Sequence, residues 1–175
     1  MGECIEISIL STTTEPVGAM LRFLKGCLKN PEAEESFAVM DNWEYENQTA
    51  VDSLAEAMEN AEGKIIFAEA GDENVRIGVF AEHGAESCII DGWINPQTAF
   101  SDEAYEALAC EAVKLLRDMK SVLACAVGRE MYVDYGKGIA EAVREAHGAD
   151  LWLLPQSAAE DCAGTPAVKI VLKDK

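Results

Sequence analysis

The chain of 175 residues carries 14 Lys and Arg against 32 Asp and Glu, a formal net charge of −18. Nucleic acids and anionic membrane surfaces are bound through basic faces, so we expect neither among the partners of this protein. The length and the hydrophobic content of 49% suit one domain over residues 1–175, and no stretch approaches the ~18 apolar residues of a membrane-spanning helix.

Apolar patterns of period two and period 3.6 alternate along the first half of the chain. They predict, in order, a strand at 3–10, a helix at 15–28, a strand at 36–41, a helix at 50–62 and strands at 64–69, 75–81 and 87–91. Residues 49–52 resemble a capping box, and Gly63 is suited to end the second helix. The last three strands are joined by short turns that contain Gly, which is typical of an antiparallel meander.

The second half opens with the longest helix signal. The patterns predict a helix at 102–120, a strand at 122–127, a strand or irregular connection at 130–135, a helix at 139–147 closed by Gly148, a strand at 151–154, a loop at 155–166 and a strand at 167–172. About four helices and about eight strands in mixed order predict a single α+β domain. Its sheet should be mixed and largely antiparallel.

Two segments, 35–61 and 86–119, resemble each other. Each begins with Glu-Ser and a short strand that leads to Asp-x-Trp, then continues through a loop with Gln-Thr-Ala into an acid-rich helix. Their alignment needs two gaps. The sequence leaves open whether the similarity is a coincidence or a weak internal repeat that builds the domain from two related halves, with Trp43 and Trp93 in equivalent places.

The leading binding hypothesis rests on a segment in which aromatic and acidic side chains alternate, namely Asp41, Trp43, Glu44, Tyr45 and Glu46. Aromatic anchors within an acidic rim are typical of surfaces that receive Arg or Lys. The structural alternative is that a Trp closes the sheet over the core, and we favour this interpretation for Trp93. The segment therefore predicts an acidic, non-catalytic accessory protein, for example an inhibitor or immunity-type partner of a basic protein.

The rival hypothesis places a small-molecule or enzymatic site near residues 132–138, with Tyr132, Asp134, Tyr135 and Lys137 as its side chains. Two glycines and a lysine between a strand and a helix can present N–H groups to an anion. The spacing matches no known phosphate loop, and glycines that only turn the chain are the structural alternative. A third hypothesis is a homo-oligomer whose Trp segments form a symmetric interface.

Few residues suit catalysis or metal binding, so we expect no cofactor, no metal and no assigned catalytic residue. His83 is expected in a turn and His147 at a helix end, without a nucleophile motif beside either. Five of the six Cys lie in apolar periodic segments, and Cys162 lies in the expected loop. Reduced thiols, together with the lack of a secretory pattern, predict a cytoplasmic protein.

Overall fold

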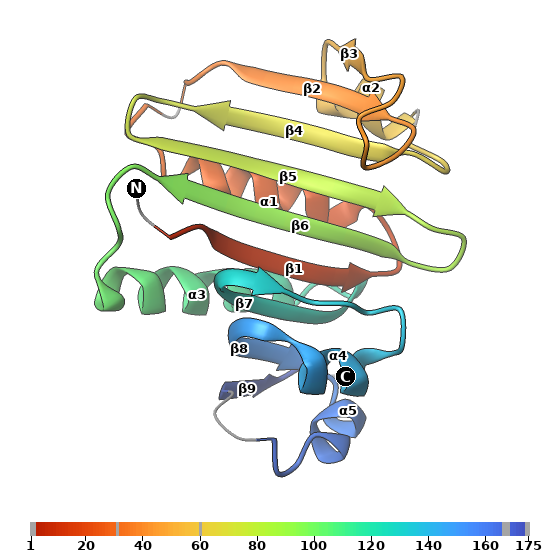
Figure 1. The fold of residues 1–175 in the computed structure, drawn as a ribbon, viewed down its shortest axis with the longest axis vertical. Coiled ribbons are helices and arrows are strands. Elements are labelled where there is room, and N and C mark those ends of the chain that lie inside the picture. Colours follow the sequence, from red (N-terminus) through yellow and green to blue (C-terminus); the bar gives the residue numbers. More distant parts are fainter. Residues whose placement is uncertain (1–2, 31, 60, 166–168, 174–175) are drawn as a thin grey trace.

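The computed structural model describes residues 3–30, 32–59, 61–165 and 169–173. Nine strands form one sheet in the order β3-β2-β4-β5-β6-β1-β7-β8-β9 (Figure 1). Neighbouring strands are antiparallel except β8 and β9, which are parallel. The predicted α+β class with a largely antiparallel sheet is confirmed. The strands are β1 Ile5–Ser11, β2 Glu35–Met40, β3 Thr49–Val51, β4 Ile65–Gly71, β5 Val75–His83, β6 Cys88–Pro96, β7 Val122–Tyr132, β8 His147–Leu154 and β9 Lys169–Leu172.

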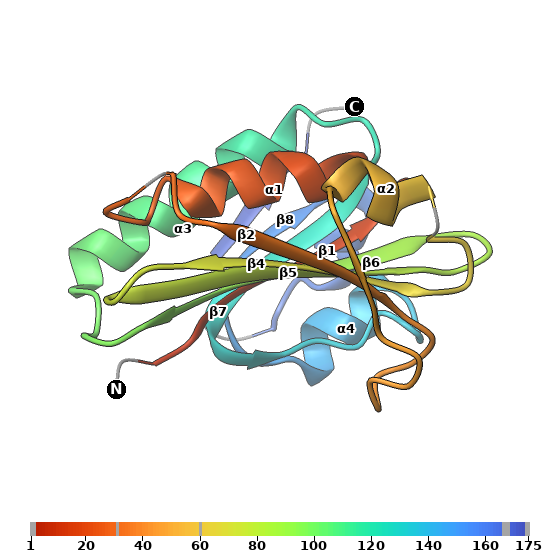
Figure 2. The ribbon, with the colours of Figure 1, turned by 90° about the horizontal axis from the view of Figure 1, so that it is seen from above.

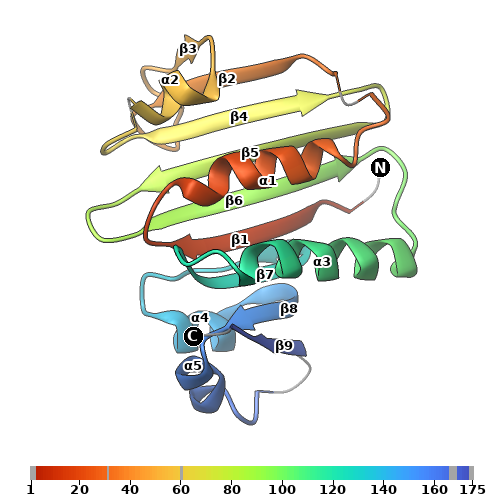
Figure 3. The same cartoon turned by 180° about the vertical axis from the view of Figure 1, so that it is seen from behind.

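The helices lie on both sides of the sheet and cover it unequally (Figures 2 and 3). They are α1 Glu15–Lys25, α2 Leu54–Glu59, α3 Asp102–Arg117, α4 Ile139–Glu145 and α5 Gln156–Asp161. The first three pack on one face and enclose the larger hydrophobic core. The other two pack on the opposite face, where a smaller core forms against β7 and β8. The described helices thus leave the second face of β2, β4, β5 and β6 uncovered, and we call this region the open face.

The N-terminal strand β1 lies between β6 and β7 and divides its side chains between the two faces. Ile5, Ile7 and Ile9 are buried in the larger core beneath the helices. Side chains alternate along a strand, so Glu6 and Ser8 project to the opposite side. The predicted alternation at 3–10 is therefore confirmed, and it brings two polar groups to the open face.

Several element boundaries differ from those predicted. Residues 49–51 form the edge strand β3, so the capping-box prediction is wrong and α2 starts only at Leu54. His147 and Gly148 begin β8 and do not end α4, which stops at Glu145. The expected loop at 155–166 contains α5, a fifth helix, and buries Cys162 behind it. In short apolar segments the sequence pattern defines element ends poorly, and tertiary packing determines where each element begins and ends.

The two Trp segments are not placed alike. Trp43 lies in the loop after β2, whereas β6 continues to Pro96 and contains Trp93 in the middle of the sheet. The proposed equivalence of the two tryptophans is therefore not observed. The two related halves remain a prediction.

No described helix is long and apolar enough to cross a membrane.

Two glycines allow β7 and β8 to approach closely where their pairing becomes irregular. The register shifts between Val127 and Gly128 and again before Tyr132. A Cβ at Gly128 would overlap the carbonyl oxygen of Gly148 and lie 2.9 Å from the Cα of Ala149. Beyond this crossing, pairing with β8 resumes at Tyr132, opposite His147, and residues 131–133 line a cleft on the open face.

We expect Gly128→Ala to lower the free energy of unfolding by about 3 kcal/mol, because the methyl group meets backbone atoms that cannot rotate away. Urea unfolding measures the change. Gly18→Ala in α1 is the matched control: its nearest neighbours would be 3.4 and 3.7 Å away. It should raise stability by about 0.5–1 kcal/mol, because Ala favours the helix. Equal stability of Gly128→Ala and the wild type would contradict the close crossing.

Candidate functional site

The loop at 41–48, which carries the first predicted site, is held together by its own hydrogen bonds. The Asn42 side-chain oxygen accepts from the N–H groups of Glu44 and Glu46 at 3.1 and 3.2 Å. Asn47 donates to the Asp41 carboxylate at 2.7 Å, which lowers the pKa of that carboxyl group. Tyr45 and Asn47 have positive φ angles of 62° and 51°, a conformation that costs free energy outside Gly. The loop therefore has a defined shape, although its side chains are exposed.

Trp43 folds from this loop back onto the open face. Its indole N–H donates to the Glu82 carboxylate at 3.1 Å, and its ring centre lies 5.3 Å from that of Phe80. The ring centre of Phe80 in turn lies 4.8 Å from that of Phe67. Trp43 remains 46% exposed and Tyr45 57% exposed. Trp43 is thus held against the sheet by Phe80 and Glu82 while part of its ring stays open to solvent. Tyr45 is exposed beside it.

The second predicted group of residues does not form one site. Tyr135 is buried, and its hydroxyl donates to the Ser8 carbonyl at 3.1 Å. Lys137 forms an ion pair of 3.0 Å with Glu145 of α4, and Asp134 accepts from the Gly136 N–H at 2.8 Å. These three residues fasten the strand-to-helix connection. Only Tyr132, which is 64% exposed, faces the open face.

Trp43 and Tyr132 line the same cleft, so one residue from each predicted site contributes to it. The cleft has a volume of about 290 Å³. The loop at 41–48 supplies one wall, and residues 131–133 supply the other. Its lining residues are Glu6, Ser8, Trp43, Phe80, Asp91, Gly92, Trp93, Met131, Tyr132 and Val133. This set contains aromatic rings, apolar atoms and two carboxylates, but no Lys, Arg or His.

The wall at 131–133 is tied to β1 through main-chain and carboxylate contacts. Glu130 has a positive φ of 46° and lies in the irregular part of the β7–β8 pairing. Its N–H donates to the Cys4 carbonyl at 2.9 Å, and its carboxylate accepts from the Cys4 N–H at 2.7 Å. The N–H of Met131 donates to the carboxylate of Glu6. The wall therefore has a fixed position relative to the floor.

Asp91 is the deepest acid of the cleft. Strand register places it between Ser8 of β1 and Phe80 of β5. One of its oxygens accepts the Ser8 hydroxyl at 2.6 Å. Burial raises the pKa of Asp91, and the nearby charge of Glu82 acts in the same direction.

Glu6 lies beside it under similar conditions: burial raises the pKa of its carboxyl group, as do the charges of Glu130 and Asp91, while the Met131 N–H opposes the shift. Two carboxylates thus lie in a cleft whose described lining contains no basic residue.

Asp91 is not among the site residues predicted from the sequence, and Trp93 is predicted to lie in the core. The expected strand stopped at residue 91, whereas β6 runs to Pro96. Within β6, Asp91 and Trp93 alternate with buried Ile90 and Ile94. This alternation was a readable signal that Asp91 and Trp93 share the face opposite the core.

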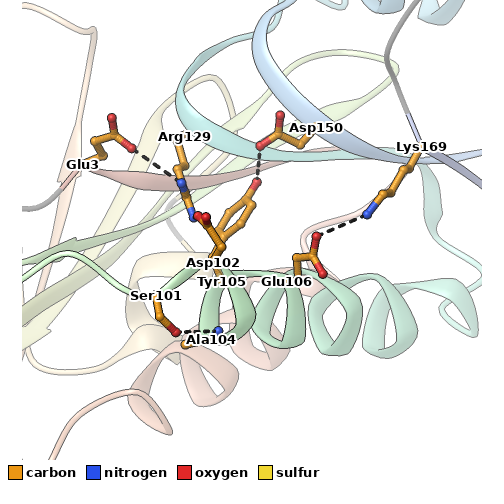
Figure 4. A network of polar contacts seen from close by, with 9 residues as sticks. All are labelled: Glu3, Ser101, Asp102, Ala104, Tyr105, Glu106, Arg129, Asp150 and Lys169. Carbon is orange, nitrogen blue, oxygen red and sulfur yellow. Dashed lines mark hydrogen bonds and ion pairs between the residues drawn. The ribbon is translucent and has the colours of Figure 1, made fainter.

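Two larger cavities are weaker candidates for a ligand site, because most of their charged side chains are engaged in contacts within the protein. The first, of about 380 Å³, lies between α3 and the strands β7 to β9 (Figure 4). There the Arg129 guanidinium lies 4.1 Å from the Tyr105 ring centre and 3.0 Å from Asp102, and the Tyr105 hydroxyl donates to Asp150 at 2.7 Å. Arg129–Glu3 at 3.8 Å and Lys169–Glu106 at 3.4 Å complete the network. Because its charges pair with one another, the network fastens α3 to the sheet.

The second, of about 570 Å³, is a groove beside α5 with apolar atoms from Val122 and Leu123. The Lys173 ammonium at this groove donates to the carbonyls of Arg117 and Met119 at 2.8 and 2.7 Å, so it caps the end of α3. We therefore assign the candidate site to the cleft between Trp43 and Tyr132.

The sequence matches no family model and none of the curated proteins with which it was compared. Within the described residues, no three His, Cys, Asp or Glu side chains are grouped so that they could hold a metal ion.

Replacement of Asp91 by Asn should make the stability of the protein depend on pH in a defined way. The raised native pKa means that Asp91 stabilises the fold fully below its unfolded pKa of about 3.9, and that this contribution is lost as the pH rises through the native pKa. Asn cannot ionise and can still accept from Ser8. The free energy of unfolding of Asp91→Asn, relative to that of the wild type, should therefore be higher at pH 7.5 than at pH 3.5.

Urea unfolding at the two pH values checks this expectation, with exposed Asp52→Asn as the control. A difference between Asp91→Asn and the wild type that is the same at both pH values would contradict it.

Tyr135→Phe should lower the free energy of unfolding by about 1 kcal/mol, because a buried hydrogen bond to Ser8 is lost. Thermal and urea unfolding measure this effect. Ligand binding at the cleft should be unchanged. Unaltered stability with loss of ligand binding would instead support the predicted site at 132–138.

Proposed function

We propose that the protein is a non-catalytic binding protein whose cleft receives a cationic side chain from a basic partner protein. The observation that carries this proposal is the lining of the cleft: aromatic walls surround Asp91 and Glu6, and none of the lining residues is basic. A cation would neutralise these carboxylates and lie against aromatic faces. It would also remove the unfavourable interaction among the acids.

The surroundings of the cleft favour a protein as the carrier of the cation. The acids of the loop at 41–48, Asp41, Glu44 and Glu46, are exposed around Trp43 and Tyr45. A net charge of −18 accelerates encounters with basic partners. In this proposal Trp43 is the central contact and the loop acids form a polar rim, the arrangement typical of binding hot spots.

A small organic cation is the second candidate, which the concave shape of the site supports. A volume of about 290 Å³ is close to the lower end for ligand pockets, roughly 300 Å³. Tyr132 and Val133 would then contact the ligand directly. The earlier alternative site at 132–138 is thereby reduced to Tyr132, because Asp134, Tyr135 and Lys137 are engaged within their own connection.

A cytoplasmic location remains part of the proposal and draws on the six free thiols of the chain. A homo-oligomer remains a further proposal. It would require a basic surface of a second copy to enter the acidic cleft, and the mass in solution tests it.

Affinity capture from a lysate of the source organism tests the leading proposal. Wild-type protein should retain a basic protein at low salt and lose it as the salt concentration rises. Trp43→Ala should weaken retention about tenfold or more, since truncation of a central aromatic residue costs ~2 kcal/mol or more. Glu111→Gln on α3, which removes one exposed charge far from the loop, should retain it. Equal retention by the wild type and Trp43→Ala would refute this surface.

A further inference from the structure

The indole of Trp93 contributes to the floor of the cleft. A Cβ at Gly78 would collide with the six-membered ring of Trp93 and lie 2.8 Å from its indole nitrogen, so the indole covers the backbone of β5 at this position. Trp93 also lines the cleft, so its ring is accessible to an occupant. The indole N–H is buried without a partner among the described residues. The contribution of Trp93 to ligand binding is consequently its ring face.

Two carboxylates share the cleft with this indole. Glu6 pairs directly with Trp93 across β1 and β6, and Asp91 precedes Trp93 by two residues on the same face. Standard strand geometry puts these neighbours about 5 Å away across the sheet and about 7 Å away along the strand. Both acids line the same cleft as the Trp93 ring, so an occupant stacked on the ring has two carboxylates within its cavity.

Each carboxylate retains one oxygen for such an occupant. Asp91 uses Oδ1 for the Ser8 hydroxyl, and Glu6 uses Oε2 for the Met131 N–H. No described residue donates to the other oxygen of either acid. The two engaged oxygens also fix the orientation of the carboxylates, which prepares the remaining oxygens for donors in a defined position.

Three kinds of organic cation make different demands on such a site. A quaternary ammonium is attracted to aromatic faces but has no N–H to donate. A primary ammonium donates in three directions and is strongly hydrated. Guanidinium and amidinium groups are planar, stack on aromatic rings and donate from their edges to carboxylates. An indole and two carboxylate acceptors in one cleft match the last kind.

We infer that the cleft selects planar cations with N–H donors at their edge, the guanidinium and amidinium class, which stack on Trp93 and donate to Asp91 and Glu6. This inference rests on the proposed function and specifies its ligand. An arginine side chain of a protein and a free small guanidine carry the same group. The inference concerns that group, and the experiment separates its two sources.

Three probes with the same aromatic ring but different cations test the inference by titration calorimetry on the 175-residue chain: benzamidine, benzylamine and benzyltrimethylammonium. Benzamidine should bind about tenfold or more tightly than either of the other two, because only it combines stacking with paired charged hydrogen bonds. Asp91→Asn should weaken benzamidine binding about tenfold or more. Glu111→Gln, with the same change in net charge, should leave it unaltered.

Two results would overturn the inference, and they differ in what they say of the proposed function. If benzyltrimethylammonium binds as tightly as benzamidine and depends on Trp43, the cleft binds cations without selecting planar ones. If no probe binds in a way that depends on Trp43 or Asp91, the proposed cation site is refuted as well. Comparison of N-acetylargininamide with methylguanidine then separates the sources: tighter binding of the former indicates a protein side chain, and equal binding indicates a free guanidine.

Discussion

The pairing of β1 with β6 on one side and β7 on the other determines where the side chains of the cleft floor lie. The register that buries Ile5, Ile7 and Ile9 beneath the helices also puts Glu6 and Ser8 on the opposite side. A slip of one residue would exchange the two sets. Burial of each isoleucine contributes roughly 1.5–3 kcal/mol, so the apolar face enforces the register and the polar face follows from it.

The carboxylates of the cleft differ from the ion pairs in the rest of the structure. Ion pairs elsewhere in the molecule, such as Arg129 with Asp102 and Lys25 with Glu35, bring opposite charges together. In the cleft, Asp91 has a hydroxyl as its only described donor, and the neighbouring charges are negative. Burial of an unpaired carboxylate disfavours its ionised form. Protons and cations would therefore compete for the same group, which links occupancy of the cleft to pH.

Local patterns in the sequence were sufficient for much of the fold. The alternation in β1, the spacing in α3 and its Ser101 cap, which accepts from the Ala104 N–H at 3.2 Å, could be read directly. The fold class followed from the order of such elements. Residues 49–52 resemble a capping box because Thr and Asp favour helix starts, but pairing with β2 makes 49–51 a strand.

The site was less accessible from sequence because it depends on contacts between distant strands. Asp91 meets Ser8 across 83 positions of the chain, and Trp43 meets Glu82 across 39. Trp43 could be singled out by its acidic neighbours. Nothing local indicated that the irregular end of β7 would bring Tyr132 to the same cleft, because that course depends on the close approach of Gly128 to Gly148.

The three tryptophans give the molecule an internal optical reference. Trp43 and Trp93 belong to the cleft, whereas Trp152 is fully enclosed in the smaller core, with the Tyr135 ring edge-on at 6.5 Å. An indole shielded from water emits at shorter wavelength than one at a wet surface. An event confined to the cleft would alter the long-wavelength part of the emission and leave the Trp152 contribution constant. Loss of the smaller core would do the reverse, so a single spectrum could distinguish occupancy of the cleft from partial unfolding.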